Sequence, residues 1–115
     1  MASLTLPYPP SVNHYWLRNR NGSVRVSQAG MTFRRQVWAI CLQERIRAIA
    51  GPVYMVIEVF PPDARRRDLD NILKPLLDAL QHGGAYGDDS QIGHLEIVRY
   101  HKRKGGEVWV TLKAI

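Results

Sequence analysis

The chain is poor in cysteine and contains no long apolar run. Its only cysteine, Cys41, lies in an apolar segment, so no disulfide forms within the chain and we expect a buried thiol in a reducing compartment. No stretch approaches the roughly 18 apolar residues of a membrane span. The opening residues, MASLTLPYPPS, lack the basic start and apolar run of a signal peptide. We therefore expect a cytoplasmic protein without a membrane partner.

Acidic residues are scarce in the first half of the chain. Seven arginines and one acid, Glu44, lie between Met1 and Ile57, and the formal net charge of the 115 residues is +6. Such an excess favours an anionic partner such as nucleic acid. Five of the ten acids instead fall between Asp68 and Asp89, with Lys74 as the one cation among them. Grouped carboxylates repel each other unless a bound cation or neighbouring arginines neutralise them, so a metal site is expected there.

The apolar periodicity predicts one α+β domain over residues 1–115. Strands are expected at 2–6, 23–27 and 53–60, helices at 32–50 and 69–80, and a terminal pair of strands around Gly105-Gly106. The Asn21-Gly22 pair predicts a turn before the second strand, Ser27 is a candidate N-cap for the helix that follows, and Gly105-Gly106 predicts a hairpin. The run 53–60 is apolar on both faces, as in a central strand covered on both sides. The order β-β-α-β-α-β-β predicts a mixed sheet with two helices and at least one crossover.

Asp68 and Asp70 stand at the entrance to the second predicted helix. In an extended backbone, residues i and i+2 point to the same face, so the two carboxylates are expected to converge. Aspartates at helix entrances also cap backbone N–H groups, and this alternative stays open. Asp88 and Asp89 follow in a loop of ordinary turn composition. Three carboxylates with open positions suit Mg²⁺, with Mn²⁺ as a substitute, whereas the histidines show no zinc spacing.

Basic residues flank these carboxylates. Lys74 follows Asp70 by four residues, where it forms an intrahelical pair with Asp70 or Asp78, or else binds a scissile phosphate and stabilises transition-state charge. Arg65, Arg66 and Arg67 are candidates for holding the flanking phosphate backbone, although a triple arginine in a loop is often simply solvated.

Four segments together resemble the RusA family of Holliday junction resolvases across nearly the whole chain: LPYPPSVNHYW, VSQAGMTFRRQV, RRRDLDNILK and YGDDSQI. The resemblance implies a small, homodimeric, Mg²⁺-dependent endodeoxyribonuclease, commonly prophage-associated, that nicks four-way DNA junctions in symmetric pairs. It implies essential aspartates at Asp68, Asp70 and Asp89, with Asp88 as the less certain neighbour. The essential lysine would be Lys74.

Two further features bear on this resemblance. Asn71 belongs to the same motif and is a candidate orienting group and DNA contact. Pro75 departs from the expected pattern, because proline disfavours helical geometry at the residue before it and so predicts an irregular first turn around Lys74.

The combined hypothesis is junction cleavage by metal-activated water, with no small-molecule cofactor. A twofold homodimer would supply two opposed cuts to a roughly twofold four-way junction. Tyr15, Trp16, Arg18 and Arg20 are candidates for contacts at the open junction centre, with packing of the two aromatic residues as the alternative. The rival hypotheses are a non-catalytic, basic nucleic-acid-binding domain and a metal-dependent nuclease acting on other branched DNA or RNA.

Overall fold

The structure, a computed structural model, describes residues 1–115 and has α+β architecture. Its strands are β1 (Ala2–Pro7), β2 (Trp16–Arg18), β3 (Val24–Val26), β4 (Val53–Phe60), β5 (Ile92–Arg99) and β6 (Glu107–Ala114). Its helices are α1 (Val12–Tyr15), α2 (Gln28–Gln43) and α3 (Asp70–His82), with a short 3₁₀ turn, η1 (Asp89–Gln91), before β5. None of the helices has the length and apolar character that crossing a membrane requires. The predicted fold class is confirmed.

The main sheet has the strand order β1-β6-β4-β5. β4 pairs in parallel with β5 and antiparallel with β6, so β4-α3-β5 forms the predicted crossover. The predicted hairpin between the last two strands is wrong, because β4 lies between β5 and β6 and the loop after β5 crosses the end of β4. The apolar β4 thereby gains a hydrogen-bonded neighbour on each edge, which satisfies its buried backbone groups.

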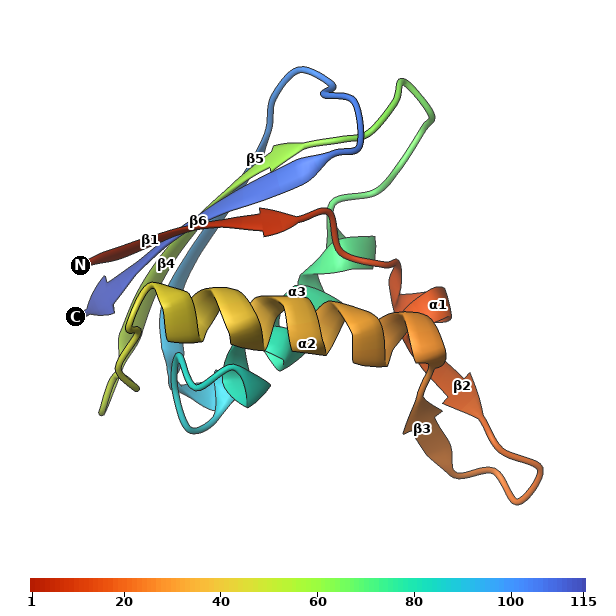
Figure 1. Cartoon of the computed structure of the whole chain (residues 1–115), viewed down its shortest axis with the longest axis horizontal. Helices are drawn as coiled ribbons and strands as arrows, with labels where there is room; N and C mark the ends of the chain where they lie inside the picture. The colour runs from red at the N-terminus through yellow and green to blue at the C-terminus, as the bar shows by residue number, and fades with distance from the viewer.

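The core lies on one side of this sheet (Figure 1). A single cluster of buried side chains joins Phe33 and Val37 of α2 and Leu76 and Leu80 of α3 to the odd-numbered residues of β4. The even-numbered residues 54, 56 and 58 on the other face are only half buried. The central position of β4 is therefore confirmed, but the expected covering of both its faces is wrong, because both long helices pack on the same face.

Helix α2 begins where the sequence predicts a cap and ends earlier than predicted. The Ser27 hydroxyl accepts a hydrogen bond from the Gly30 N–H at 2.9 Å, as an N-cap does. The helix ends at Gln43, and Arg45 has a left-handed φ of 54°. Ile46 and Ile49 continue the apolar spacing beyond this end because they still pack against the core. Their contribution extended the predicted helix to residue 50.

A short hairpin projects from the body of the molecule (Figure 1). Its strands β2 and β3 pair antiparallel around the predicted Asn21-Gly22 turn, and Gly22 has a φ of 87° that favours glycine. The hairpin follows α1, a helix of four residues that the periodicity did not reveal. A helix this short contains too few residues to show a 3.6-residue repeat.

Candidate active site

Helix α3 carries most of the predicted site on its exposed side. Its apolar stripe places Ile72, Leu76 and Leu80 in the core and leaves Asp70 and Lys74 exposed. Pro75 is buried inside the helix and does not end it, because α3 continues to His82. The first turn is tightened, with Asn71 and Ile72 N–H groups donating to the carbonyls three residues earlier.

The entrance to α3 is not extended as predicted. Leu69 has helical dihedrals, φ −60° and ψ −35°, so Asp68 and Asp70 are related by a turn rather than by strand geometry. Both side chains are exposed, and neither carboxylate forms a hydrogen bond or an ion pair with the rest of the chain. Neither aspartate caps the helix, because no backbone N–H donates to either side chain.

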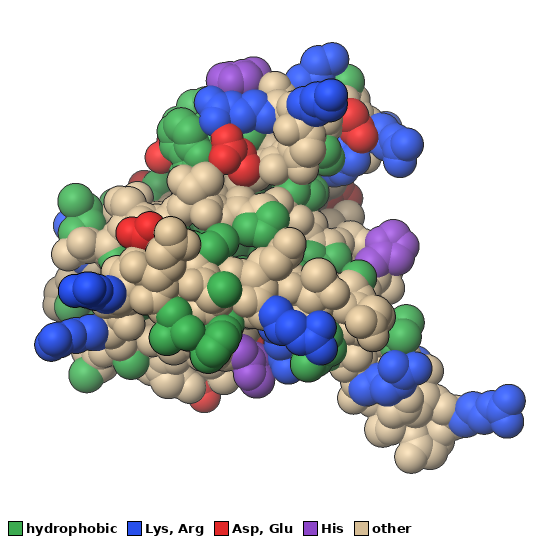
Figure 2. All heavy atoms as spheres, viewed as in Figure 1, with side chains coloured by type: hydrophobic (Ala, Val, Ile, Leu, Met, Phe, Trp, Pro, Cys, Tyr) green, Lys and Arg blue, Asp and Glu red, His purple; other side chains and the backbone are tan.

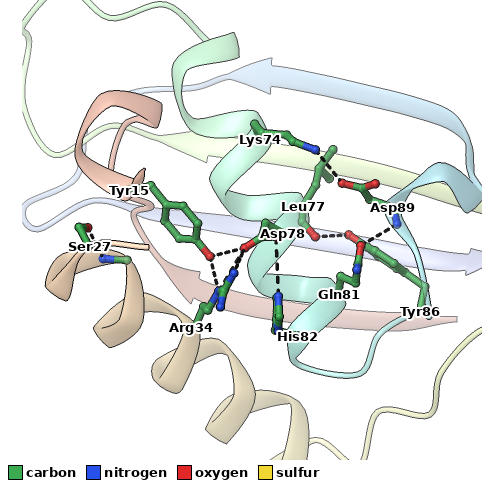
Figure 3. Close-up of polar contacts among 11 residues, drawn as sticks. Tyr15, Ser27, Arg34, Lys74, Leu77, Asp78, Gln81, His82, Tyr86 and Asp89 are labelled. Carbon is green, nitrogen blue, oxygen red and sulfur yellow. Dashed lines mark hydrogen bonds and ion pairs between the residues drawn. The ribbon is translucent and has the colours of Figure 1, made fainter. Parts of the chain in front are cut away.

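Lys74 links the helix to the loop after it (Figure 3). Its ammonium nitrogen lies 3.2 Å from a carboxylate oxygen of Asp89. The alternative intrahelical pairs with Asp70 and Asp78 are both absent. The fold therefore brings together two of the predicted residues that are 15 positions apart in the sequence.

The backbone of Asp89 is held by a residue that the sequence did not single out. The Asp89 N–H donates to the side-chain oxygen of Gln81 at 2.9 Å, and Gln81 lies on the same side of α3 as Lys74 (Figure 3). The only sequence signal is its position seven residues after Lys74, two helical turns away on the same face. Gln81 therefore positions the residue with which Lys74 pairs.

Gln91 fixes the same turn from its other end. Its side-chain oxygen accepts from the N–H groups of Gly87 and Asp88, and its side-chain nitrogen donates to the carbonyls of Ile49 and Gly51. Asp88 caps η1 by accepting from the Ser90 N–H at 2.8 Å. This backbone hydrogen bond holds the pKa of Asp88 below its usual value.

The predicted carboxylates do not form a compact cluster. No three aspartate, glutamate, histidine or cysteine side chains are grouped closely enough to hold a metal ion. Asp68 and Asp70 lie at the start of α3, whereas Asp89 is occupied by Lys74. The set of metal ligands and catalytic groups stays a prediction.

Beside the Lys74–Asp89 pair, Asp78 of α3 takes part in a network that ties three helices together (Figure 3). The Tyr15 hydroxyl donates to Asp78 at 2.5 Å, and Arg34 donates to the same carboxylate oxygen at 2.8 Å. Burial opposes ionisation of Asp78, but these hydrogen bonds outweigh it and lower the pKa. Burial and the hydrogen bond to Asp78 raise the pKa of Tyr15.

The predicted contact of Tyr15 with DNA is wrong, because its side chain is fully buried. Trp16 packs edge-on against the Tyr15 ring and remains partly exposed. For Tyr15, therefore, the packing alternative holds. Arg18 and Arg20 lie exposed on the β2–β3 hairpin and form no hydrogen bond or ion pair.

The three predicted DNA-binding arginines surround a surface hollow at the start of α3. The hollow is lined by Tyr8, Ser11, His14, Arg65, Arg66, Arg67, Asp68, Asn71 and Ile72. Arg67 pairs with Asp63 at 2.5 Å, and this hydrogen bond, aided by one from the Arg65 N–H, lowers the pKa of Asp63 to about 2. Arg65 and Arg66 stay exposed, and Arg66 has no acidic partner. The sequence missed Asp63, which restrains Arg67.

Exposed carboxylates, a lysine and a basic hollow at one helix end are the groups that a nuclease needs. The model of the family described as Endodeoxyribonuclease RusA matches residues 7–113. The chain is 40% identical over 111 residues to the crossover junction endodeoxyribonuclease RusA of Escherichia coli, and the alignment covers 96% of this chain and 92% of that protein. The Shigella sonnei protein of the same name gives the same values.

A phage protein is similar to nearly the same extent. The crossover junction endodeoxyribonuclease of Enterobacteria phage 82 is 39% identical over 110 residues, covering 95% of this chain and 91% of the phage protein. The fold and these matches define the class of this protein as an endodeoxyribonuclease. Within that class, the chain belongs to the RusA family.

Proposed function

We propose that this chain is a divalent-metal-dependent endodeoxyribonuclease that resolves four-way DNA junctions by paired, symmetric nicks. The observation that carries the proposal is the exposed side of α3, where free Asp68 and Asp70 carboxylates precede the Lys74–Asp89 pair. These four groups are exposed or only half buried, so burial in the core does not account for their presence. The names of the similar proteins support the choice of junction DNA as substrate.

The donor atoms suit a hard cation. Asp68, Asp70 and Asp89 supply only carboxylate oxygens, the ligands that Mg²⁺ and Mn²⁺ prefer, and no thiol or paired imidazole competes nearby. Asp68 and Asp70 have no partner within the chain, which leaves their oxygens free for a metal. When bound, such a cation activates a water for attack on the phosphodiester and stabilises the leaving oxygen, giving 5′-phosphate and 3′-hydroxyl ends. We propose Mg²⁺ as this cation.

Lys74 would act on the phosphate rather than on the metal. Its ammonium group is held at the exposed side of α3 by Asp89, within reach of a backbone lying along that helix. A positive charge placed there stabilises the negative charge that develops on the phosphate oxygens in the transition state. Asp89 would therefore exchange between orienting Lys74 and coordinating the cation.

Binding would begin with phosphate contacts from the exposed arginines. Arg65, Arg66 and the partly restrained Arg67 border the start of α3, and Asn71 lines the same hollow. Arg18 and Arg20 on the projecting hairpin are candidates for contacts near the junction centre, with the partly exposed Trp16 at the base of the hairpin. Because one chain carries one such site, a homodimer would make the two opposed cuts in cytoplasmic DNA.

The decisive experiment separates cutting from binding. Asp70→Asn keeps the size of the side chain but removes its charge, so we expect cutting of a synthetic four-way junction with Mg²⁺ to be abolished while junction binding in EDTA persists. Glu44→Gln, the same charge change just beyond α2, is the matched control and should cut normally. Unchanged cutting by Asp70→Asn would contradict the proposal.

The wild-type protein distinguishes the remaining alternatives. Junction binding without cutting in Mg²⁺ or Mn²⁺ would indicate a non-catalytic binding module. Cutting of linear duplex as rapidly as of the junction would contradict junction specificity. A molecular mass of one chain per junction, measured by light scattering on the complex, would contradict the homodimer.

A further inference from the structure

The loop between β5 and β6 is strongly basic and is not part of the candidate site. Four of the six residues from Arg99 to Lys104 are arginine or lysine, and none is acidic. Lys102 and Lys104 are exposed and form neither a hydrogen bond nor an ion pair. Lysine side chains without an acidic partner are available to bind phosphate groups of nucleic acid. Whether Lys102 and Lys104 can share a partner with the candidate site depends on where this loop lies.

Arg103 anchors this loop instead of facing solvent as a free cation. Its guanidinium carbon lies 4.2 Å from the centre of the Phe60 ring and 5.0 Å from that of Trp109. The same group also pairs with Glu107, and the Arg103 N–H donates to the Pro61 carbonyl at 2.8 Å. Stacking and pairing together fix the loop, and they leave the lysines on either side of Arg103 exposed.

The fixed loop packs against the loop that leads into α3. A side chain at Gly106 would place its Cβ only 2.9 Å from Tyr8 and 3.0 Å from Pro62, so glycine permits the close approach. The Arg99 guanidinium donates a hydrogen bond to the Arg67 carbonyl, directly before Asp68. The loops at 61–69 and 100–106 project from the same end of the molecule (Figure 1). They therefore form one surface that adjoins the start of α3.

The outward charge of this joint surface is positive. Asp63 is paired with Arg67 and the adjoining Glu107 with Arg103, which leaves Asp68 as the one unpaired carboxylate in the two loops. Lysine and arginine side chains gather at this end of the molecule in Figure 2. The least restrained of them are Arg65, Arg66, Lys102 and Lys104, two from each loop. Cations from two separate segments suit two stretches of phosphate backbone, as in a double helix.

We propose that the β5–β6 loop, through Lys102 and Lys104, is a second phosphate-contacting element that holds a duplex arm of the DNA. Together with Arg65 and Arg66 it would guide that arm toward the exposed side of α3. The inference rests on the proposed function for the identity of the polymer. In this arrangement both loops contact the phosphates of the duplex arm, and these contacts do not require the centre of a four-way junction.

The test compares two double variants that remove the same charge from opposite ends of the molecule. Lys102→Gln/Lys104→Gln removes the proposed contacts. Arg47→Gln/Lys113→Gln is the control, because these two residues line a hollow at the other end of the sheet, beside the chain termini. Binding of a 25-base-pair duplex and of a four-way junction is measured in EDTA at several salt concentrations, so the result does not depend on cutting.

Loss of two phosphate contacts lowers affinity about tenfold and reduces the slope of log affinity against log salt by about 2. We expect this change for Lys102→Gln/Lys104→Gln on both DNAs, little change for the control, and restored binding in Lys102→Arg/Lys104→Arg. The maximal cutting rate at saturating junction should stay at the wild-type value. Equal weakening by the control, a loss confined to the junction, or wild-type affinity would each overturn the proposal. Absence of cutting by the wild type would count against the proposed function alone.

Discussion

The ammonium group of Lys74 lies 3.2 Å from the carboxylate of Asp89, and this pair joins α3 to the turn that precedes β5. The side chain of Lys74 is 62% exposed and that of Asp89 is 26% exposed. Exposed ion pairs contribute only about 0–1 kcal/mol to stability. The pair therefore has a small structural role, and its arrangement is better explained by function.

Lys74→Gln should separate activity from stability. We expect the single-turnover rate of junction cutting to fall about 100-fold, because one positive group is lost where transition-state charge develops. The free energy of unfolding in urea should change by less than about 1 kcal/mol. A Lys74→Gln protein that cuts normally would show that the lysine serves only the ion pair.

Metal affinity should move in the opposite direction from activity in the same variant. Lys74 occupies Asp89 and adds a positive charge beside the proposed ligands, so its removal frees a carboxylate oxygen and lessens repulsion of a cation. We expect Lys74→Gln to bind Ca²⁺ or Mn²⁺ at least as tightly as the wild type in isothermal titration calorimetry without DNA. Weaker binding in this variant would mean that Lys74 supports the metal site and does not compete with it.

Gln81 offers a test of positioning. Gln81→Leu removes the acceptor for the Asp89 N–H, which lies 2.9 Å from the Gln81 oxygen, and so frees the turn that carries Asp89. We expect the cutting rate at saturating junction to fall about tenfold with unchanged DNA affinity, as when a catalytic group is misplaced. Gln81→Glu keeps an acceptor oxygen and should recover most of the rate. Gln36→Leu, on the exposed surface of α2, is the matched control. Equal effects of Gln81→Leu and Gln36→Leu on the cutting rate would contradict a positioning role for Gln81.

Much of this fold follows from local patterns in the sequence. The stripe of α3, the Ser27 cap and the Asn21-Gly22 turn each depend on a few neighbouring residues, and each was predictable. The order of the last two strands was not, because Gly105-Gly106 reads locally as a hairpin. β5 and β6 are separated because they pair with opposite edges of β4, and both edges of this buried strand need hydrogen-bond partners.

The candidate site was predictable in its residue types but not in its pairings. Asp68, Asp70 and Asp89 could be singled out because acidic residues are concentrated between positions 68 and 89 of an otherwise basic chain. The Lys74–Asp89 contact and the role of Gln81 depend on how the turn folds back onto α3. The sequence suggests a DNA contact for Tyr15 because Arg18 and Arg20 follow it closely, whereas a partner 63 residues away, Asp78, satisfies its hydroxyl in the folded protein.

The absence of a side chain at Gly30 is required for the packing of α2. A Cβ there would lie 2.5 Å from a methyl carbon of Val26 and 2.7 Å from the Tyr15 carbonyl. Backbone cannot yield as a flexible side chain does, so Gly30→Ala should destabilise the protein by about 1–3 kcal/mol despite the higher helix propensity of alanine. Thermal unfolding checks this, with Ala29→Gly as a control for propensity alone. An unchanged melting temperature in Gly30→Ala would contradict the close packing.

The Tyr15–Arg34–Asp78 network predicts a dependence of stability on pH. The pKa of Asp78 is lowered in the folded protein, because the hydrogen bonds from Tyr15 and Arg34 outweigh its burial. A lowered folded pKa means that the carboxylate contributes its full stability above its ordinary value of about 4, and that this contribution is lost as the pH falls toward the folded value. The wild type should therefore lose stability relative to Asp78→Asn between about pH 5 and pH 3.

Urea unfolding of the wild type and of Asp78→Asn at several pH values measures this difference. At neutral pH, Asp78→Asn should be less stable by about 1–3 kcal/mol, since Arg34 then lacks a charged partner for a part-buried guanidinium. The gap should narrow on acidification, because the asparagine side chain does not titrate. A gap that stays constant from neutral pH to pH 3 would mean that Asp78 is not the titrating group. Cutting per folded molecule should be nearly unchanged, because the Asp78 side chain points toward Tyr15 and Arg34 and contacts neither Lys74 nor Asp89 (Figure 3).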